Sequence, residues 1–285
     1  MIELSRRGQG WQVGHGGDTL NTAIHLARLG HDVAYLTALG HDPFAAGLID
    51  RWRNEGLDCS LVLRHPARAT GLYAISTDVA GERSFAYWRE ASAAREMFML
   101  PETAAACAAA AEADVLAFSL ITLAILPPEG REWLFGLARA VRGRGGQVAF
   151  DGNYRPRLWP CPDAAREARD AAIALADIGF PTLEDEEMLS GEADAAAVAA
   201  HWRALGCGET VVKLGAAGCR LADGAIIPPP KVLAPVDTSG AGDAFNAGYL
   251  SARVRGAEPT AAALAGHALA GWTVMRPGAI PDRDP

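Results

Sequence analysis

Lysine is nearly absent from this sequence, and its scarcity narrows the chemistry that the protein can perform. Only Lys213 and Lys231 occur among 285 residues, and neither follows a glycine. A phosphate-binding loop of the G-x-x-x-x-G-K-[ST] type is therefore excluded, because its lysine must stand directly after the loop glycine. Any phosphate that this protein binds has to be held by other groups.

Excess positive charge, paired cysteines and long apolar runs are also missing. The 26 Lys and Arg residues stand against 34 Asp and Glu, which leaves a net charge of −8 and no basic field to gather nucleic acid or an anionic membrane. The five cysteines include no C-x-x-C pair, so reduced thiols are favoured over a metal cluster or disulfide framework. The longest apolar stretch, 115–128, is too short to cross a bilayer, and we expect a cytoplasmic protein.

Helix-like and strand-like segments alternate along most of the chain. Apolar residues recur at helical spacing over 18–29, 44–55, 129–143, 163–176, 194–205, 241–255 and 259–275. Strand-like runs occupy 33–37, 115–119, 147–150, 178–180 and 210–213. This order predicts one α/β domain over 1–285, with a mostly parallel central sheet covered by helices on both faces.

A different texture appears at 71–88, where two stretches alternate apolar and polar residues around a turn that contains Gly81. The pattern predicts a hairpin with one packed face and one open face, which could act as a lid. Exposed strand edges often pair, so a homo-oligomer is expected, with a dimer through the lid as one form.

The segment Asp237-Thr-Ser-Gly-Ala-Gly-Asp243 is the most informative for chemistry. Its small residues lead directly into a helix, and a helix start with free N–H groups is an anion site. The amides of Gly240, Ala241 and Gly242 could therefore hold a phosphoryl group, while Asp243 accepts a proton from a substrate hydroxyl. A lone G-x-G-D would more often be a helix cap, but the whole string favours a catalytic base.

This string closely resembles the C-terminal signature of the ribokinase-like (pfkB) carbohydrate kinases, in which the Asp at the position of Asp243 is the catalytic base. Asn21-x-Ala23, with Gly30 and Gly40, resembles the other signature of that family. Within the family, three strings resemble 2-keto-3-deoxygluconate kinases: Gly16-Gly-Asp-Thr-Leu-Asn21, Gly71-Leu-Tyr73 followed by 81–89, and Asp151-Gly-Asn-Tyr-Arg-Pro-Arg-Leu-Trp159.

The resemblance spans nearly the whole chain and implies a three-layer α/β/α fold with a small β lid, whose strands we expect to come from about 1–14 and 70–92. It also implies that a first β-strand, usual in those kinases, is missing before Met1, so we expect either a start codon upstream or a truncated chain. The implied reaction is ATP-dependent phosphorylation of 2-keto-3-deoxygluconate to 2-keto-3-deoxy-6-phosphogluconate. Alternatives are a kinase for fructose or an epimeric keto-deoxy sugar acid, and a catalytically impaired sugar-binding homologue.

A sugar acid should be read by arginine together with polar or aromatic groups. The resemblance places in the sugar pocket Gly16, Gly17, Asp18, Thr19, Leu20, Tyr73, Tyr87, Trp88, Arg89 and Arg155. The alternatives are cross-strand packing for the tyrosines and solvated surface charge for the arginines.

The ATP side is expected to use Asn153, Lys213, Gly215 and Gly218 together with Gly240 and Gly242. For the two glycines after Lys213, a plain hairpin turn is the alternative. Many family members hold Mg²⁺ through Asn-x-x-Glu, where this chain has Thr182-Leu-Glu-Asp185. Asp185 is therefore the metal candidate, acting directly or through water; the alternative is that its acidic segment only favours a helix start.

Overall fold

A parallel sheet of four strands forms the middle of the protein in a computed structural model, which describes residues 1–7, 10–77 and 83–283. Its order is β12-β11-β10-β9. The strands are β9 (Val115–Ser119), β10 (Gln147–Asp151), β11 (Ile178–Phe180) and β12 (Glu209–Thr210). A parallel bridge between Thr182 and Lys213 leads on to an antiparallel extension of β13 (Val212–Lys213), β14 (Cys219–Arg220) and β15 (Ile226–Ile227).

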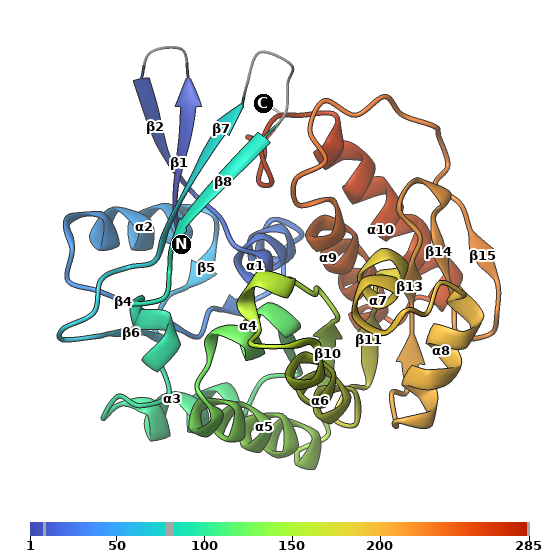
Figure 1. Cartoon of the computed structure of the whole chain (residues 1–285), viewed down its shortest axis with the longest axis horizontal. Helices are drawn as coiled ribbons and strands as arrows, with labels where there is room; N and C mark the ends of the chain where they lie inside the picture. Colours follow the sequence, from blue (N-terminus) through green and yellow to red (C-terminus); the bar gives the residue numbers. More distant parts are fainter. Residues whose placement is uncertain (8–9, 78–82, 284–285) are drawn as a thin grey trace.

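The two faces of this sheet bury different sets of helices (Figure 1). Val148 and Phe150 on β10 belong to a core with α4 (Leu120–Ile125), α5 (Pro128–Gly143), α6 (Pro162–Ile173) and α8 (Ala195–Ala204). Ala149, which points the opposite way, packs in a core with α9 (Ala241–Val254) and α10 (Pro259–Val274). The expected three-layer α/β/α arrangement with a mostly parallel sheet is confirmed.

The first part of the chain adds two short parallel pairs beside α1 (Asp18–Arg28) and α2 (Pro43–Asn54). These pairs are β3 (Val33–Ala34) with β5 (Leu57–Asp58), and β4 (Thr37–Leu39) with β6 (Val62–Arg64). The single strand expected over 33–37 is therefore wrong. The ladder is interrupted at Tyr35, whose ring packs edge-on against Trp52 and whose hydroxyl bonds Thr19.

Two further sequence expectations need correction. The strand expected over 210–213 is split into β12 and β13. Helix α4 was not expected at all; it begins at a capping box in which Ser119 and Thr122 each bond the other's main chain. The remaining helices are α3 (Thr103–Ala110), α7 (Leu183–Ser190), η1 (Ala93–Glu96), η2 (Pro156–Leu158) and η3 (Gly215–Ala217).

A separate four-stranded sheet, called here the small sheet, stands out from this body above α1 and α2 (Figure 1). Its order is β2-β1-β7-β8, from β1 (Ile2–Arg7), β2 (Gly10–His15), β7 (Leu72–Thr77) and β8 (Arg83–Trp88). The predicted hairpin is confirmed as β7 and β8, and the N-terminal segment supplies the other two strands. The turn predicted around Gly81 lies outside the described residues.

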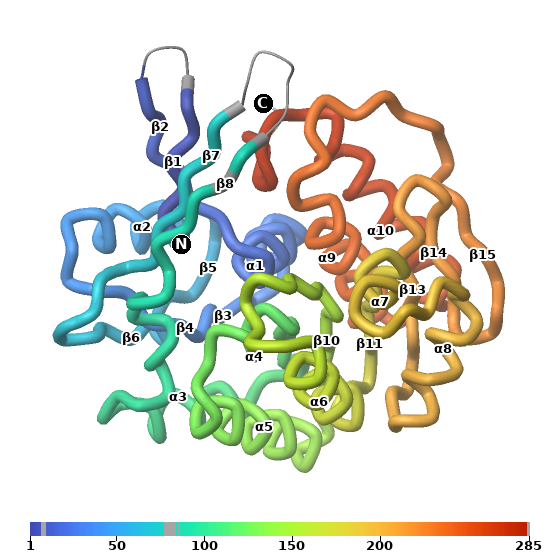
Figure 2. Tube along the Cα trace, in the orientation of Figure 1, coloured from blue at the N-terminus to red at the C-terminus, as the bar shows by residue number. Residues whose placement is uncertain are grey.

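Helices α1 and α9, from opposite ends of the chain, pack against each other in the middle of the molecule (Figure 2). The last described residues join them there: Arg28 on α1 donates to the carbonyl of Pro281 at 2.6 Å. None of the described helices has the length and apolar character needed to cross a membrane. The expectation of a strand before Met1 stays a prediction.

Candidate active site

The predicted glycine turn opens α9 at the centre of the molecule. Gly240 is the N-cap residue, in a left-handed conformation with φ 70°. A Cβ there would lie 2.7 Å from the Cβ of Ala279, so only glycine fits between the turn and the C-terminal segment. The first N–H groups of a helix have no intrahelical acceptor. Gly240, Ala241 and Gly242 are partly exposed, so this helix start can receive an anion.

Asp243 lies in the first turn of α9 and is only 8% exposed. The side-chain amide of Asn21 donates to its Oδ2 at 2.7 Å. Burial and the negative charges of Asp18 and Asp151 raise the pKa of Asp243 to about 7, although Asn21 and Lys213 favour its charged form. A carboxyl with this pKa can exchange a proton near neutral pH, as a general base requires.

The residues expected on α1 divide between the site and the core. Asp18 accepts a hydrogen bond from Ser119 Oγ, and burial raises its pKa. Thr19 instead bonds the hydroxyl of Tyr35 at 3.1 Å, and Leu20 is fully buried in the core with α2. Gly17, with φ 145°, is the N-cap of α1. Among these residues, Asp18 is the one whose charge acts on Asp243.

Tyr73 on β7 reaches from the small sheet to the start of α1. Its hydroxyl donates to Glu3 on β1, and a Cβ on Gly16 would collide with that hydroxyl. Its ring stacks on Tyr87 with centroids 6.0 Å apart. The Arg89 guanidinium lies over the Tyr87 ring, 4.1 Å from its centroid. Only a glycine at position 16 leaves room for the Tyr73 hydroxyl, and this allows the small sheet to contact the body here.

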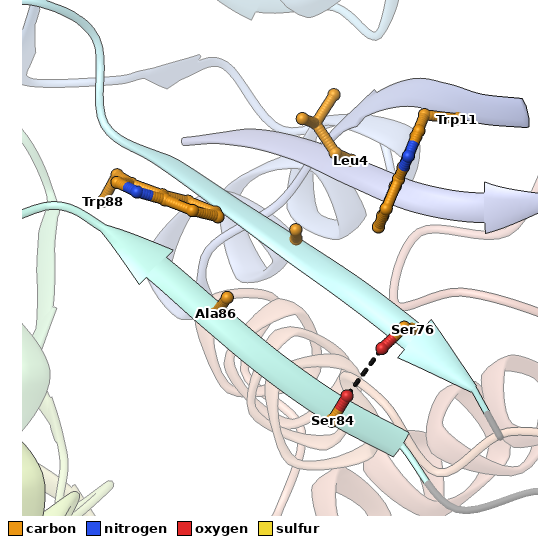
Figure 3. A pocket seen from close by; sticks show the side chains of 7 residues that line it. Leu4, Trp11, Ser76, Ser84, Ala86 and Trp88 are labelled. Atoms are coloured by element: carbon orange, nitrogen blue, oxygen red, sulfur yellow. Dashed lines mark hydrogen bonds between the residues drawn. The ribbon is translucent and has the colours of Figure 1, made fainter.

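Trp88, also predicted in the sugar pocket, does not lie with Tyr73 and Tyr87. It pairs with Leu72 on the neighbouring strand, whereas Tyr87 pairs with Tyr73, so the two side chains project from opposite faces of the small sheet. Trp88 is 61% exposed and lines a hollow with Leu4 and Trp11 (Figure 3). Its placement does not support a role in the sugar pocket.

Arg155 and Asp185 meet beyond the carboxyl end of β10, where ligands bind in open α/β sheets. Their Nη1 and Oδ1 atoms are 3.2 Å apart, and the Arg155 side chain is half exposed. Burial lowers the pKa of Arg89, and the charges that act on it include Asp18 and Arg155. The two predicted arginines, one next to the small sheet and one on the body, thus lie within electrostatic range of each other and of Asp18.

Lys213, one of the two lysines, is buried at the end of β13. Its Nζ donates to Asp151 Oδ1 at 2.8 Å and to Asn246 Oδ1 at 3.4 Å. The amide of Asn246 donates to Asp151 Oδ2 at 3.0 Å, which closes the network. Nζ is 3.6 Å from the place where a Cβ of Gly242 would lie, so this positive charge lies directly beside the glycine turn.

The glycines after Lys213 differ in their surroundings. A Cβ on Gly218 would lie 2.8 Å from Pro228 Cα, so this glycine is needed where the hairpin closes on the end of β15. Gly215, with φ 59°, has open space around it and leaves the main chain accessible to a ligand. Asn153 has a buried Oδ1 without a hydrogen-bond partner in the described part of the chain.

The donor set for a divalent cation is sparse. In the described ranges, no group of three or more His, Cys, Asp or Glu side chains is arranged to hold a metal. Asp185 offers one carboxylate, which also accepts from the Tyr154 amide at 3.3 Å, and burial raises its pKa to about 6. One carboxylate fits Mg²⁺, which usually keeps several waters and binds substrate phosphates.

Several groups in the site were given no role from the sequence. These are Asn21, Ser119, Asp151 and Asn246. Three of them carried a usable signal: Asn21 stands in two of the quoted motifs, Asn246 stands three residues after Asp243 on the same side of its helix, and Asp151 ends a buried strand. Ser119 carried no signal of its own.

Fold and site together define an enzyme that transfers a phosphoryl group to a small hydroxylated acceptor. The sequence profile of "pfkB family carbohydrate kinase" matches residues 2–284, and the chain belongs to this family.

Individual relatives agree with this assignment. The chain is 42% identical to a 2-dehydro-3-deoxygluconokinase of Escherichia coli (strain K12), an alignment that covers 100% of this chain and 95% of that protein. It is 41% identical to a 2-dehydro-3-deoxygluconokinase of Dickeya dadantii (strain 3937), covering 98% and 94%. Aminoimidazole riboside kinase from Salmonella enterica, solved with aminoimidazole riboside and an ATP analogue, matches with a TM-score of 0.82 and 27% identity over 98% of this chain and 92% of that one.

Proposed function

We propose that this protein is a 2-dehydro-3-deoxygluconokinase: it transfers the γ-phosphoryl group of ATP to the 6-hydroxyl of 2-keto-3-deoxygluconate. The observation that carries the proposal is the buried Asp243 carboxylate beside the start of α9. Arg89 and Arg155 both lie within electrostatic range of Asp18, whose charge in turn acts on Asp243. The similarity to 2-dehydro-3-deoxygluconokinases along the whole chain supports the choice of substrate.

In the proposed reaction, Asp243 accepts the proton of the attacking hydroxyl. That oxygen forms a bond to the γ-phosphorus while the bond from the γ-phosphorus to the β,γ-bridging oxygen breaks, and ADP leaves with the electron pair. The amides of Gly240, Ala241 and Gly242 stabilise charge on the phosphoryl oxygens, as does the nearby ammonium of Lys213.

The carboxylate of the sugar acid is proposed to bind Arg89 and Arg155, because a guanidinium matches a carboxylate with paired hydrogen bonds. Asp18 and the stacked pair of Tyr73 and Tyr87 supply polar and aromatic contacts to the rest of the sugar. Residues 1–285 would form one kinase domain in which the small sheet acts as the lid and excludes water that would otherwise hydrolyse ATP.

ATP is proposed to lie along the carboxyl end of the central sheet, near Asn153 and Gly215. The unpaired Oδ1 of Asn153 is an acceptor that a nucleotide could satisfy. Asp185 would hold Mg²⁺ through its water shell, and the ion supplies neutralisation of the phosphate charge. Since the reaction consumes ATP, we propose that the protein works in the cytoplasm.

The face of the small sheet that carries Trp11 and Trp88, called here the outer face, is proposed to pair with a second copy of this chain. Trp11 and Trp88, 53% and 61% exposed, flank a hollow of about 410 Å³ on that face (Figure 3). Large exposed apolar side chains around one hollow are typical of an interface, and a twofold axis would let each copy fill the other's hollow.

The substrate proposal is tested by a coupled ATP assay with ketodeoxygluconate, ketodeoxygalactonate, fructose and ribose. We expect ketodeoxygluconate to have the highest kcat/KM. Arg155→Gln should lower kcat/KM for the sugar acid by about 10–100-fold, because a charge-assisted hydrogen bond contributes about 1.5–3 kcal/mol. Activity with a neutral hexose, where measurable, should change less than threefold.

Arg157→Gln is the matched control, because Arg157 is an exposed arginine only two residues away. It should leave both activities unchanged. If the wild-type enzyme prefers fructose, the proposed substrate is wrong and the protein is a fructose kinase. If no sugar in the assay is phosphorylated, the protein is a sugar-binding homologue without kinase activity.

A further inference from the structure

Helix α1 contacts residue 243 at two points. Asn21 donates its side-chain amide to Asp243 Oδ2 at 2.7 Å, and the hydroxyl of Thr22 donates to the Asp243 carbonyl oxygen at 3.2 Å. The first bond ends on the carboxylate and the second on the main chain. These two neighbours therefore allow the two kinds of contact to be tested separately.

We infer that Asn21 is a positioning residue for phosphoryl transfer: it holds the Asp243 carboxylate by one oxygen, so that the other oxygen faces the acceptor hydroxyl. The inference rests on the proposed function, because it assumes that Asp243 is the base. Within the described residues, Oδ1 of Asp243 has no hydrogen-bond donor, so that oxygen is available for the incoming proton.

The burial of Asn21 supports a functional reason for its presence. The residue is 5% exposed where α1 packs against α9, and its Oδ1 has no partner in the described part of the chain. Burying an amide with an unsatisfied acceptor is destabilising, and an apolar residue would fill such a helix contact more favourably. The hydrogen bond to the Asp243 carboxylate is the contribution of Asn21 that offsets this loss of stability.

The charged groups that face Asp243 come from several elements. Asp18 on α1 and Asp151 on β10 disfavour its ionised form, whereas Lys213 on β13 favours it. On β7, the Tyr73 phenol also lies within electrostatic range of Asp243. Asn21 adds no charge but donates directly to the carboxylate, so its removal should raise the pKa of Asp243 and leave the side chain free to rotate.

The test compares Asn21→Ala, Asn21→Asp and Thr22→Val by the pH profile of kcat/KM. The acid limb is the low-pH side of this profile, where protonation of the base lowers kcat/KM. Both Asn21 variants should move the acid limb of the profile upward by about one pH unit, with the larger shift for Asn21→Asp, which adds a like charge at the same place. At pH 7, kcat should fall about 10–100-fold while the Kd of the sugar changes less than threefold. Thr22→Val should leave the acid limb in place.

A second measurement does not depend on turnover. The pH dependence of unfolding, compared with and without Asp243→Asn, reports the pKa of Asp243 in each Asn21 background. An upward shift of that pKa supports the inference even if the sugar proposed above proves wrong. An unchanged pKa together with an unchanged acid limb in both Asn21 variants would overturn it.

Discussion

At the scale of single residues, the catalytic role proposed for Asp243 and its effect on stability oppose each other. The protein buries this carboxyl near two other carboxylates, which raises its pKa from 3.8 to about 7. The folded state therefore binds the Asp243 proton more tightly than the unfolded chain does. Between about pH 4 and pH 7, stability falls as pH rises, because only the unfolded chain releases this proton freely.

Asp243→Asn should accordingly abolish activity and stabilise the fold at the same time. Turnover should fall by about 10³-fold or more, since the proposed base is lost. At pH 8 the variant should be more stable than the wild type by up to about 4 kcal/mol, because each pH unit between the two pKa values corresponds to about 1.4 kcal/mol. Near pH 4 the difference should vanish. Urea unfolding at both pH values measures it.

Asp50→Asn is the control for this comparison. Asp50 is largely exposed and lies 3.8 Å from Arg53 within the same helix. Its stability difference from wild type should stay within about 0.5 kcal/mol at either pH. A difference for Asp243→Asn that does not grow from pH 4 to pH 8 would show that Asp243 does not titrate as described.

The residues of the site were easier to predict than the contacts between them. The glycine turn and Asp243 lie in one continuous string, and the string itself indicates a helix start beside an anion site. Asn21 and Asp243 are 222 positions apart, and Lys213 and Asp151 are 62 apart. Such partners are joined only by folding, so no local pattern could reveal that Lys213 is paired with a carboxylate.

At the scale of elements, α9 is bounded by glycines with the same left-handed conformation but different surroundings. Gly240 at its start has φ 70° and packs against Ala279. Gly256, just past its end, has φ 83°, and no atom lies within 4 Å of the place where its Cβ would be. The pair separates the effect of backbone conformation from the effect of packing against the C-terminal segment.

Gly240→Ala should reduce kcat by about 100-fold, because the collision with Ala279 displaces the amides that are proposed to hold the phosphoryl group, and a displacement of about 1 Å can have such an effect. Gly256→Ala should destabilise the protein by about 1–2 kcal/mol through its positive φ but leave kcat unchanged. Equal kcat for the two variants would mean that the turn is not positioned by this contact. Steady-state kinetics and thermal unfolding decide between the outcomes.

Elements with a clear hydrophobic period were the easiest to predict. Strands β9 and β11 have the expected bounds, and α5, α9 and α10 differ from expectation by a residue or so at their ends. The strands at 33–37 and 210–213 were less predictable, since each interrupts its ladder and changes partner. A change of pairing partner is a tertiary event that leaves no local pattern.

At the scale of the whole molecule, the layers follow from the alternation of helices and strands, but the orientation of the small sheet does not. The alternating pattern of β8 predicts two faces without indicating which one looks toward the site. The register shows that Tyr87 shares the face of Tyr73, while Trp88 lies on the outer face with Trp11. The small sheet thus presents one face to the site and leaves an apolar face outside.

The pairing proposed for the outer face predicts the oligomeric state of the protein. We expect the protein to sediment as a dimer of twice the 29.9 kDa chain. Trp88→Asp should convert it to a monomer, because a buried, unpaired carboxylate at the interface is strongly unfavourable. Trp133→Asp is the control, since Trp133 is a 43% exposed tryptophan on α5, outside the small sheet, and it should leave the dimer intact.

Dimer formation should also affect catalysis, because Arg89 directly follows Trp88 in the chain. Packing of the outer face would restrain the strand that carries Tyr87 and Arg89 over the site. The Trp88→Asp monomer should therefore show a raised KM for the sugar acid and a smaller change in kcat. A wild-type monomer at micromolar concentration, or a Trp88→Asp variant that remains dimeric, would show that the second copy does not bind this face.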